Sequence, residues 1–291
     1  MKIALFGKEF SPIYNKYINH LINKLQEKEI EIIIHSEFYE FLNEFIPFKK
    51  GVKVFHEIKS SDNIEYLFSI GGDGTLLRAI TYVKDSNIPV LGINTGRLGF
   101  ISSVSTDQLD VVIDNVLEGN YKIRRRTVLK LETENNLFGN TNFALNEVAI
   151  VKKDTSSMIR IDAFINNEFL NSYWADGLLI STPTGSTGYS LSCGGPIILP
   201  GTENIIIAPI APHNLNVRPI IINENEIIKL KIEDRDQLAL VSLDSRSRAF
   251  DSSLELIIKK GDFKINLIEP KDNSFITTIR NKLMWGSDKR N

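Results

Sequence analysis

The first hundred residues alternate short apolar runs with longer amphipathic stretches, and this alternation is the feature that most narrows the possible folds. The apolar runs have the length of a strand and lie at residues 2–6, 30–34, 66–70 and 88–93. Between the first two, residues 11–28 place apolar side chains at the spacing of one helix face. Alternating strands and helices are typical of a parallel β-sheet covered by helices. We therefore expect an α/β N-terminal domain with a parallel sheet over residues 1–120.

The pattern changes after Tyr121, where apolar and polar residues alternate singly between short groups of Asn, Gly and Asp. Period-two alternation with such punctuation is typical of antiparallel strands. Residues 121–270 are therefore predicted to form a mostly antiparallel, all-β C-terminal domain that binds substrate. Residues 271–291 are expected to form a tail that packs back on the N-terminal domain.

Composition excludes several classes of protein. The 34 basic and 36 acidic residues nearly cancel, so no nucleic-acid partner and no membrane surface is expected. A single cysteine, Cys193, rules out an internal disulfide and a multi-cysteine zinc site, and it fits a reducing compartment. No apolar stretch approaches the roughly 20 residues of a membrane span, and the apolar run at the start is too short for a signal peptide. We expect a cytoplasmic protein.

The glycine-rich turn Gly71-Gly72-Asp73-Gly74 follows one predicted strand and precedes a predicted helix. Glycines allow the backbone to approach a phosphate, and a helix N-terminus favours an anion. A carboxylate beside a triphosphate is repulsive unless it binds the metal, accepts the proton of an attacking hydroxyl or orients that hydroxyl. Asp73 thus indicates a kinase. The alternative is an ordinary turn in which Asp73 caps the helix.

Three further motifs lie in the second domain. The polar pair Asn146-Glu147 interrupts an apolar run, which also fits a solvated edge or a bulge, and Asp176-Gly177 also fits a simple turn. Residues 182–196 contain many hydroxyl side chains and glycines between two apolar runs. A dense set of hydrogen-bonding groups in that setting favours a binding loop over a linker.

Taken in order, these motifs resemble those of the NAD kinase family over nearly the whole chain. The resemblance rests on GGDGT at 71, INTGRLGF at 93, NEVAI at 146, ADG at 175 and TPTGSTGYSLSCGGP at 182. It implies ATP-dependent transfer of phosphate to the 2′-hydroxyl of the adenosine ribose of NAD, which gives NADP. It also implies Mg²⁺ or another divalent metal, with no metal ligand assigned to a residue, and a homodimer or homotetramer.

The same resemblance assigns roles to residues. Asp73 is the catalytic residue, either as general base or by orienting the hydroxyl. Asn146 and Glu147 hold the adenosine part of the dinucleotide or assist the metal, and Asp176 lies near a ribose or the nicotinamide. The remaining substrate-binding residues are Gly72, Gly74, Ser157, Thr187, Gly188, Tyr189, Ser190, Leu191, Ser192 and Arg246.

Three positions depart from the family's commoner pattern. Trp174 stands where many relatives have Arg, so stacking on a ring would replace a charge contact. Gly188 stands where Ala is usual. Arg246 stands where Gln is frequent, and we expect its cation to meet a phosphate.

Two other functions remain open at this point. A lipid kinase of the diacylglycerol or sphingosine type shares a GGDGT-like turn, but the sequence has no amphipathic helix suited to a membrane. A dinucleotide sensor without catalysis is the second alternative. The presence of Asp73 argues against it, because a carboxylate would only weaken the binding of an anionic ligand.

Overall fold

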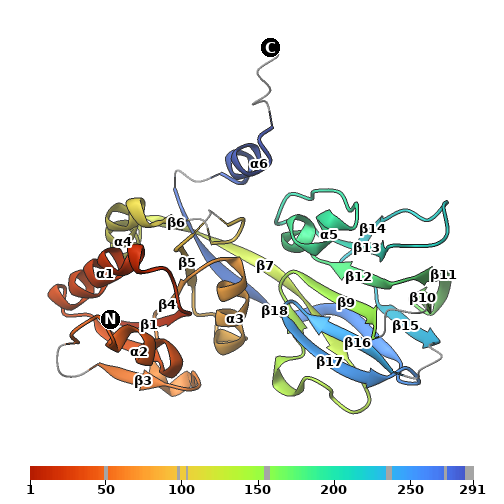
Figure 1. The fold of residues 1–291 in the computed structure, drawn as a ribbon, viewed down its shortest axis with the longest axis horizontal. Helices are drawn as coiled ribbons and strands as arrows, with labels where there is room; N and C mark the ends of the chain where they lie inside the picture. Colours follow the sequence, from red (N-terminus) through yellow and green to blue (C-terminus); the bar gives the residue numbers. More distant parts are fainter. Residues whose placement is uncertain are drawn as a thin grey trace. The chain divides into compact units, whose positions relative to one another are not determined.

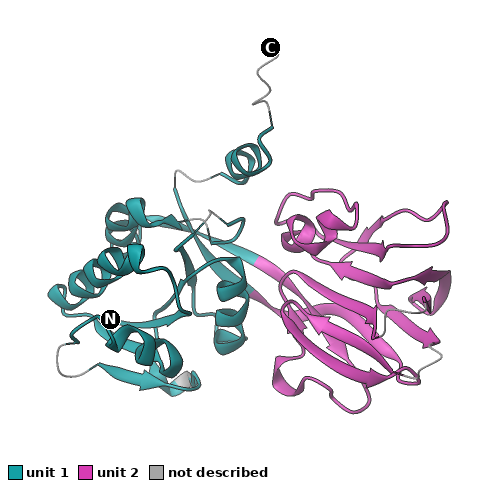
Figure 2. Cartoon of the chain, viewed as in Figure 1, with its two compact units in different colours: residues 1–125, 265–291 teal, residues 126–264 magenta. Residues whose placement is uncertain are grey.

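The computed structural model describes residues 1–48, 52–96, 99–102, 104–153, 158–233, 238–271 and 274–285 (Figure 1). The chain divides into two compact units, drawn in different colours in Figure 2. Unit 1 contains Met1–Arg125 and Ile265–Asn291, and unit 2 contains Arg126–Lys264. The chain passes from one unit to the other within two strands, β7 (Tyr121–Glu132) and β18 (Leu256–Pro270). The C-terminal residues thus belong to the same unit as the N-terminal ones.

Unit 1 is built on a parallel sheet, as the sequence predicted. Its strands are β1 (Lys2–Gly7), β2 (Glu31–His35), β3 (Lys53–Phe55), β4 (Tyr66–Ile70), β5 (Val90–Asn94) and the short β6 (Val104–Ser105). They lie in the order β5-β4-β1-β2-β3, with β6 and the end of β18 both paired to β5, and each of these pairings is parallel. Strand β4 is buried over four of its five residues, which explains its almost continuous apolar sequence.

The helices of unit 1 each bury part of their surface. They are α1 (Asn15–Glu27), α2 (Ser36–Asn43), α3 (Asp73–Val83), α4 (Leu109–Leu117) and α6 (Phe275–Leu283), with 3₁₀ turns η1 (Pro12–Tyr14), η2 (Ser60–Asp62) and η3 (Thr106–Gln108). In α1, the buried residues Ile18, Leu21, Ile22 and Leu25 repeat every three or four positions. Helix α1 begins later than the sequence indicates, because the 3₁₀ turn η1 precedes it, and the Ser11 side chain makes no capping hydrogen bond.

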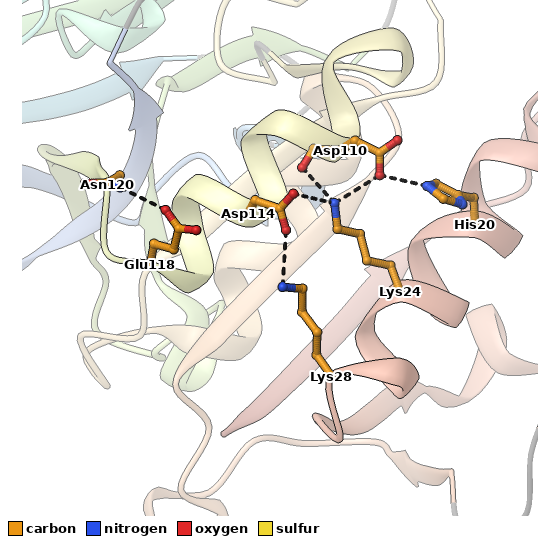
Figure 3. Close-up of polar contacts among 7 residues, drawn as sticks. All are labelled: His20, Lys24, Lys28, Asp110, Asp114, Glu118 and Asn120. Atoms are coloured by element: carbon orange, nitrogen blue, oxygen red, sulfur yellow. Dashed lines mark hydrogen bonds and ion pairs between the residues drawn. The ribbon is translucent and has the colours of Figure 1, made fainter.

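Polar side chains link α1 to α4 at the surface of unit 1 (Figure 3). Lys24 Nζ lies 2.8 Å from Asp114 Oδ2 and 3.1 Å from Asp110 Oδ1. Lys28 also pairs with Asp114, and His20 with Asp110. The Lys24 side chain is only 14% exposed, so its two ion pairs are the better shielded ones of this network.

Unit 2 consists of two antiparallel sheets. One contains β11 (Glu168–Ala175), β10 (Ile159–Ile165), β15 (Ile228–Glu233) and the first part of β18 in that order, and β8 (Phe143–Ala144) pairs with β7. The other contains β14 (Ile220–Asn223), β13 (Asn204–Ile210), β12 (Gly177–Ser181), β9 (Glu147–Lys152), β16 (Leu238–Leu243) and β17 (Arg246–Asp251) in that order. The predicted mostly antiparallel arrangement is confirmed for both.

One apolar core in unit 2 takes residues from both of its sheets. Ile161 and Leu230 come from the first sheet, Ile150 and Ile207 come from the second, and all four side chains are buried. Short helical turns complete the unit: η4 (Gly139–Thr141), η5 (Thr184–Thr187) and α5 (Tyr189–Ser192). None of the helices in the described ranges combines the length and the apolar character needed to cross a bilayer.

Candidate active site

Asp73 is the first residue of α3, directly after β4 and the two glycines of the turn. Its carboxylate does not cap the helix, so that alternative reading of the turn is wrong. It accepts hydrogen bonds from a separate segment of unit 1 instead. The backbone N–H of Phe100 donates to Oδ2 at 2.8 Å, and Oδ1 accepts from the backbone N–H groups of Ile101 and Ser102 at 3.2 and 2.8 Å. The hydroxyl of Ser102 donates to Oδ1 as well, at 2.9 Å.

The close approach of this segment to Asp73 depends on glycine. A β-carbon at Gly99 would lie 1.9 Å from Asp73 Oδ1, well inside contact distance. Gly71 adopts a φ of +149°, and a β-carbon there would lie 2.3 Å from Thr75 Oγ1. By contrast, a β-carbon at Gly72 or Gly74 would meet no other described residue within 4 Å. The two glycines predicted to bind substrate therefore face open space.

Helix α6 contacts the segment that holds Asp73. Lys282 Nζ lies 4.8 Å from the centroid of the Phe100 ring, which is the distance of a cation–π interaction. The backbone N–H of the same Phe100 donates to the Asp73 carboxylate. The C-terminal helix is thus connected to Asp73 through one residue.

In unit 2, the pair Asn146-Glu147 is held by Asp244 at the turn between β16 and β17. The Asp244 carboxylate accepts the backbone N–H groups of Leu145, Asn146 and Glu147 at 2.9, 2.8 and 3.2 Å. The backbone N–H of Asp244 donates in return to the carbonyl of Glu147 at 3.0 Å. Because both side chains are also less than 10% exposed, the pair is neither a solvated edge nor a loose bulge.

The side chains of Asn146 and Glu147 keep unused acceptors. Within the described residues, Asn146 Oδ1 and Glu147 Oε2 are buried without a hydrogen-bond partner. Burial raises the pKa of Glu147 to about 8, the neighbouring Asp244 charge adds to the shift, and a backbone hydrogen bond from Tyr189 opposes it. Buried polar atoms without partners are rare in folded proteins. These two mark a place for a ligand.

The hydroxyl-rich segment after β12 is folded onto unit 2 and is not a linker. Thr182 Oγ1 donates to the carbonyl of Leu145 at 2.6 Å and accepts from the backbone N–H of Gly185. Ser186 Oγ likewise bonds both the carbonyl and the backbone N–H of Ile198. These bonds hold the turns η5 and α5 beside the Asn146-Glu147 pair.

The loop residues predicted to bind substrate are those from Thr187 to Ser192. A β-carbon at Gly188 would stand 3.1 Å from Glu147 Oε2 and 3.3 Å from Asn146 Nδ2, so this backbone and the two side chains are in contact. Ser190 is buried, and its Oγ has no partner among the described residues. Tyr189 is 42% exposed. Thr187 and Leu191 are half-buried, and Ser192 is exposed.

Asp176 lies between β11 and β12 and pairs with Lys152 of β9. Lys152 Nζ is 2.6 Å from Asp176 Oδ1, and the backbone N–H of Lys152 donates to the Asp176 carbonyl at 3.0 Å. The Asp176 side chain is still 41% exposed. It is therefore accessible to a ligand. Trp174, two residues earlier, is exposed as well.

Arg246 makes contacts that the sequence did not suggest. Its Nη1 and Nη2 donate to the carbonyl oxygens of Thr141 and Phe143, and its guanidinium lies over the Phe143 ring. Contact with a phosphate, which stays a prediction, would require these bonds to be shared or broken. Ser157, another predicted contact, lies outside the described residues.

Comparison with known proteins agrees with these motifs. Residues 6–121 match the ATP-NAD kinase N-terminal domain, and residues 145–270 match the ATP-NAD kinase C-terminal domain. The chain belongs to the ATP-NAD kinase family. Over 294 residues, and over the full length of both chains, it is 49% identical to an NAD kinase of Cytophaga hutchinsonii and 47% identical to one of Flavobacterium johnsoniae. The sequence-based prediction of an NAD kinase is confirmed.

Solved structures of ATP-NAD kinases share the fold. The yeast NADH kinase in complex with NADH superimposes with a TM-score of 0.87 at 25% identity, covering 100% of this chain and 89% of that one. An NAD kinase from Archaeoglobus fulgidus in complex with ATP gives a TM-score of 0.77 at 24% identity, covering 98% and 99% of the two chains. The predicted combination of an α/β domain and an antiparallel β domain is therefore confirmed.

Four residues of this ATP-NAD kinase that hold Asp73 or the Asn146-Glu147 pair in place were not singled out from the sequence. They are Asn94, Gly99, Ser102 and Asp244. Asn94 is the last residue of β5 and Gly99 lies in the glycine-bearing stretch that follows, which did carry a signal. Ser102 contacts Asp73 over a separation of 29 positions in the chain, and Asp244 contacts Asn146 over a separation of 98. No local sequence pattern marks such distant partners.

Proposed function

We propose that this chain transfers the γ-phosphoryl group of ATP to the 2′-hydroxyl of the adenosine ribose of NAD, with Asp73 as the catalytic residue. The observation that supports this role is the unequal use of its two carboxylate oxygens. Among the described residues, Oδ1 accepts three hydrogen bonds and Oδ2 accepts one. Oδ2 thus keeps capacity for one more donor, such as a substrate hydroxyl.

The ionised carboxylate is the form that accepts a proton or orients a hydroxyl. Once the hydroxyl oxygen attacks the γ-phosphorus, its proton passes to Oδ2 and the bond to the leaving ADP oxygen breaks. Most of the catalysis in such a transfer comes from positioning and charge stabilisation. The exposed backbone of Gly72 and Gly74, at the N-terminus of α3, is suited to lie against phosphate oxygens.

We propose that the residues around the Asn146-Glu147 pair in unit 2 bind the dinucleotide. Oxygens of Asn146, Glu147 and Ser190 that have no partner in the part of the chain that the structure describes are available to a ligand with donors. With its raised pKa, Glu147 carries a proton at neutral pH, so it also offers a hydrogen-bond donor to the ligand. The exposed Tyr189 ring is suited to stacking, and the accessible Asp176 carboxylate is suited to a ribose hydroxyl or the nicotinamide. Thr187, Gly188, Leu191 and Ser192 complete this proposed surface.

Mg²⁺ is proposed to arrive with ATP as part of the substrate complex. The described ranges contain no group of three or more His, Cys, Asp or Glu that could hold a metal ion by themselves. That arrangement fits Mg²⁺, which commonly binds through one or two carboxylates together with substrate phosphates and water. Asn146, whose Oδ1 has no partner among the described residues, and Glu147, in its ionised form, are the residues that would assist it. A cytoplasmic location and a homodimer or homotetramer are also proposed.

The test is to incubate the purified chain with NAD, ATP and Mg²⁺ and to detect NADP with an NADP-specific dehydrogenase. We expect NADP to form, and we expect Asp73→Asn to lower turnover by at least about a hundredfold, because the amide cannot accept the proton. Turnover that survives within a few-fold in Asp73→Asn would remove Asp73 from the mechanism. No NADP from folded protein, with NADH and other phosphate donors also tried, would instead favour the dinucleotide sensor or the lipid kinase.

A further inference from the structure

Ser102 is the residue that contacts Asp73 twice. Its backbone N–H and its hydroxyl both donate to Asp73 Oδ1, at 2.8 and 2.9 Å. The side chain is fully buried, so no water competes with these bonds. Ser102 thus fixes one carboxylate oxygen, while the other oxygen keeps spare capacity.

Asn94, at the end of β5, determines where the Ser102 hydroxyl proton points. Asn94 is 2% exposed, and its Oδ1 accepts the backbone N–H of Gly96 at 2.7 Å. Because that backbone group is a donor, the atom facing it must be the amide oxygen, so the amide nitrogen faces Ser102. Asn94 Nδ2 donates to Ser102 Oγ at 3.0 Å. The hydroxyl therefore accepts from Asn94 and gives its own proton to Asp73.

Close packing holds Ser102 at this place. A β-carbon at Gly92 of β5 would lie 2.7 Å from Ser102 Cα, so the strand leaves no space for the segment to shift toward it. The backbone carbonyl of Ser102 accepts from the N–H of Gly99 at 3.2 Å, which closes the segment into a tight turn. Asn94, Ser102 and Asp73 form a directional chain of hydrogen bonds inside unit 1.

We propose that Ser102 and Asn94 are positioning residues for the phosphoryl transfer. Through this chain they orient the Asp73 carboxylate so that Oδ2 meets the substrate hydroxyl. The proposal rests on the proposed function of Asp73. Its consequence is that the loss of the Ser102 hydroxyl affects the chemical step and leaves the binding of NAD nearly unchanged.

The main test compares Ser102→Ala with Ser102→Thr, which keeps the hydroxyl. Removing a hydrogen bond to a charged group is expected to lower kcat roughly tenfold or more. The KM for NAD should stay within about threefold, since no contact with NAD is removed. Ser102→Thr should keep kcat within about threefold of the wild-type chain. A kcat of Ser102→Ala within about twofold of wild type, or a loss that lies in KM alone, would overturn the proposal.

A double variant separates positioning from a general weakening of the fold. If Ser102 acts through Asp73, Asp73→Asn combined with Ser102→Ala should be as active as Asp73→Asn alone, within about twofold. Effects that multiply in the double variant would overturn the proposal. NADP formation by the wild-type chain is the reference for all of these rates. Its absence would overturn the proposed function, whereas the outcomes above concern only the positioning residues.

Asn94→Asp provides a second route if Ser102→Ala does not fold. The substitution keeps the shape, but it replaces the donor that faces Ser102 with an acceptor, so the hydroxyl proton turns away from Asp73. We expect kcat to fall at least about tenfold. A kcat within about twofold of wild type would overturn the directional chain.

Discussion

The carboxylate of Asp244 accepts the backbone N–H of Asn146 at 2.8 Å, although the two residues are 98 positions apart in the chain. Asp244 also adopts a φ of +53°, at the turn that joins β16 to β17. The turn of one hairpin thereby determines the backbone conformation of the Asn146-Glu147 pair at the start of β9. Arg246, two residues further, fixes the same region through the carbonyls of Thr141 and Phe143.

Replacing Asp244 with Ala is expected to lower the free energy of unfolding by about 3 kcal/mol, because three backbone N–H groups lose their acceptor and alanine is strained at a positive φ. Urea denaturation followed by circular dichroism measures this change. The control is Ser245→Ala at the exposed neighbouring position, which should stay within about 0.5 kcal/mol of wild type. A loss below about 1 kcal/mol for Asp244→Ala would contradict the role given to this carboxylate.

The raised pKa of Glu147 predicts how stability changes with pH. The folded chain holds a proton on Glu147 up to about pH 8, whereas the unfolded chain releases it near the ordinary value of 4.5. The contribution of Glu147 to the free energy of unfolding is therefore fully present below pH 4.5 and is lost as the pH rises to about 8. The total loss is a few kcal/mol at most.

Glu147→Gln removes this titration while keeping the size of the side chain. The unfolding free energies of the wild-type chain and Glu147→Gln are measured without ligand from pH 5 to pH 9. The stability of the wild-type chain relative to Glu147→Gln should fall steadily with rising pH and become constant above about pH 8. A difference that does not depend on pH would show that Glu147 is not protonated in the folded chain.

Gly99→Ala should abolish most of the activity, because its β-carbon would collide with Asp73 Oδ1 and force the segment of residues 99–102 away. We expect a loss of at least about a hundredfold in kcat, comparable with the loss of the carboxylate itself. Gly96→Ala is the matched control, since a β-carbon there would make only an ordinary contact of 3.7 Å with Asn94 Oδ1. Equal rates for both variants would contradict the close approach.

Lys24→Met should destabilise unit 1 without changing the rate of NADP formation per folded molecule. Lys24 is the best shielded cation of the network between α1 and α4, and its removal leaves Asp110 and Asp114 with weaker partners (Figure 3). We expect a loss of about 1 to 2 kcal/mol in thermal or urea unfolding. Lys28→Met, at a side chain that is 48% exposed, should cost less than about 0.5 kcal/mol. Similar losses for both would contradict this ranking.

Much of the fold followed from local patterns. The spacing of Ile18, Leu21, Ile22 and Leu25 predicted α1, and the apolar run before the glycines predicted β4. Element ends were less accurate: Ser11 precedes a 3₁₀ turn, and α3 begins at Asp73, inside the glycine-rich turn that was expected to precede the helix. Ends depend on individual hydrogen bonds, which a periodic pattern does not contain.

In the candidate site, too, some residues could be selected from local sequence patterns and others could not. Glycines, hydroxyl side chains and an isolated carboxylate are chemically unusual in their local setting, so Asp73, Asn146 and the loop after Ser181 could be selected from the sequence. Their partners could not be, because Ser102 and Asp244 are ordinary polar residues until the fold brings them near. Arg246 illustrates the limit, since no local pattern in the sequence indicates that its guanidinium donates to two backbone carbonyl oxygens.

The sequence by itself determined the order of strands and helices, the class of each domain and the residue types available for phosphoryl transfer, because these depend on neighbours within a few positions. Only the tertiary structure decided that Asp73 Oδ1 is occupied by Ser102, that Oδ2 keeps capacity and that Glu147 is buried enough to hold a proton. The physical reason is that hydrogen bonding and desolvation depend on what surrounds an atom in space, and those surroundings come from residues far away along the chain.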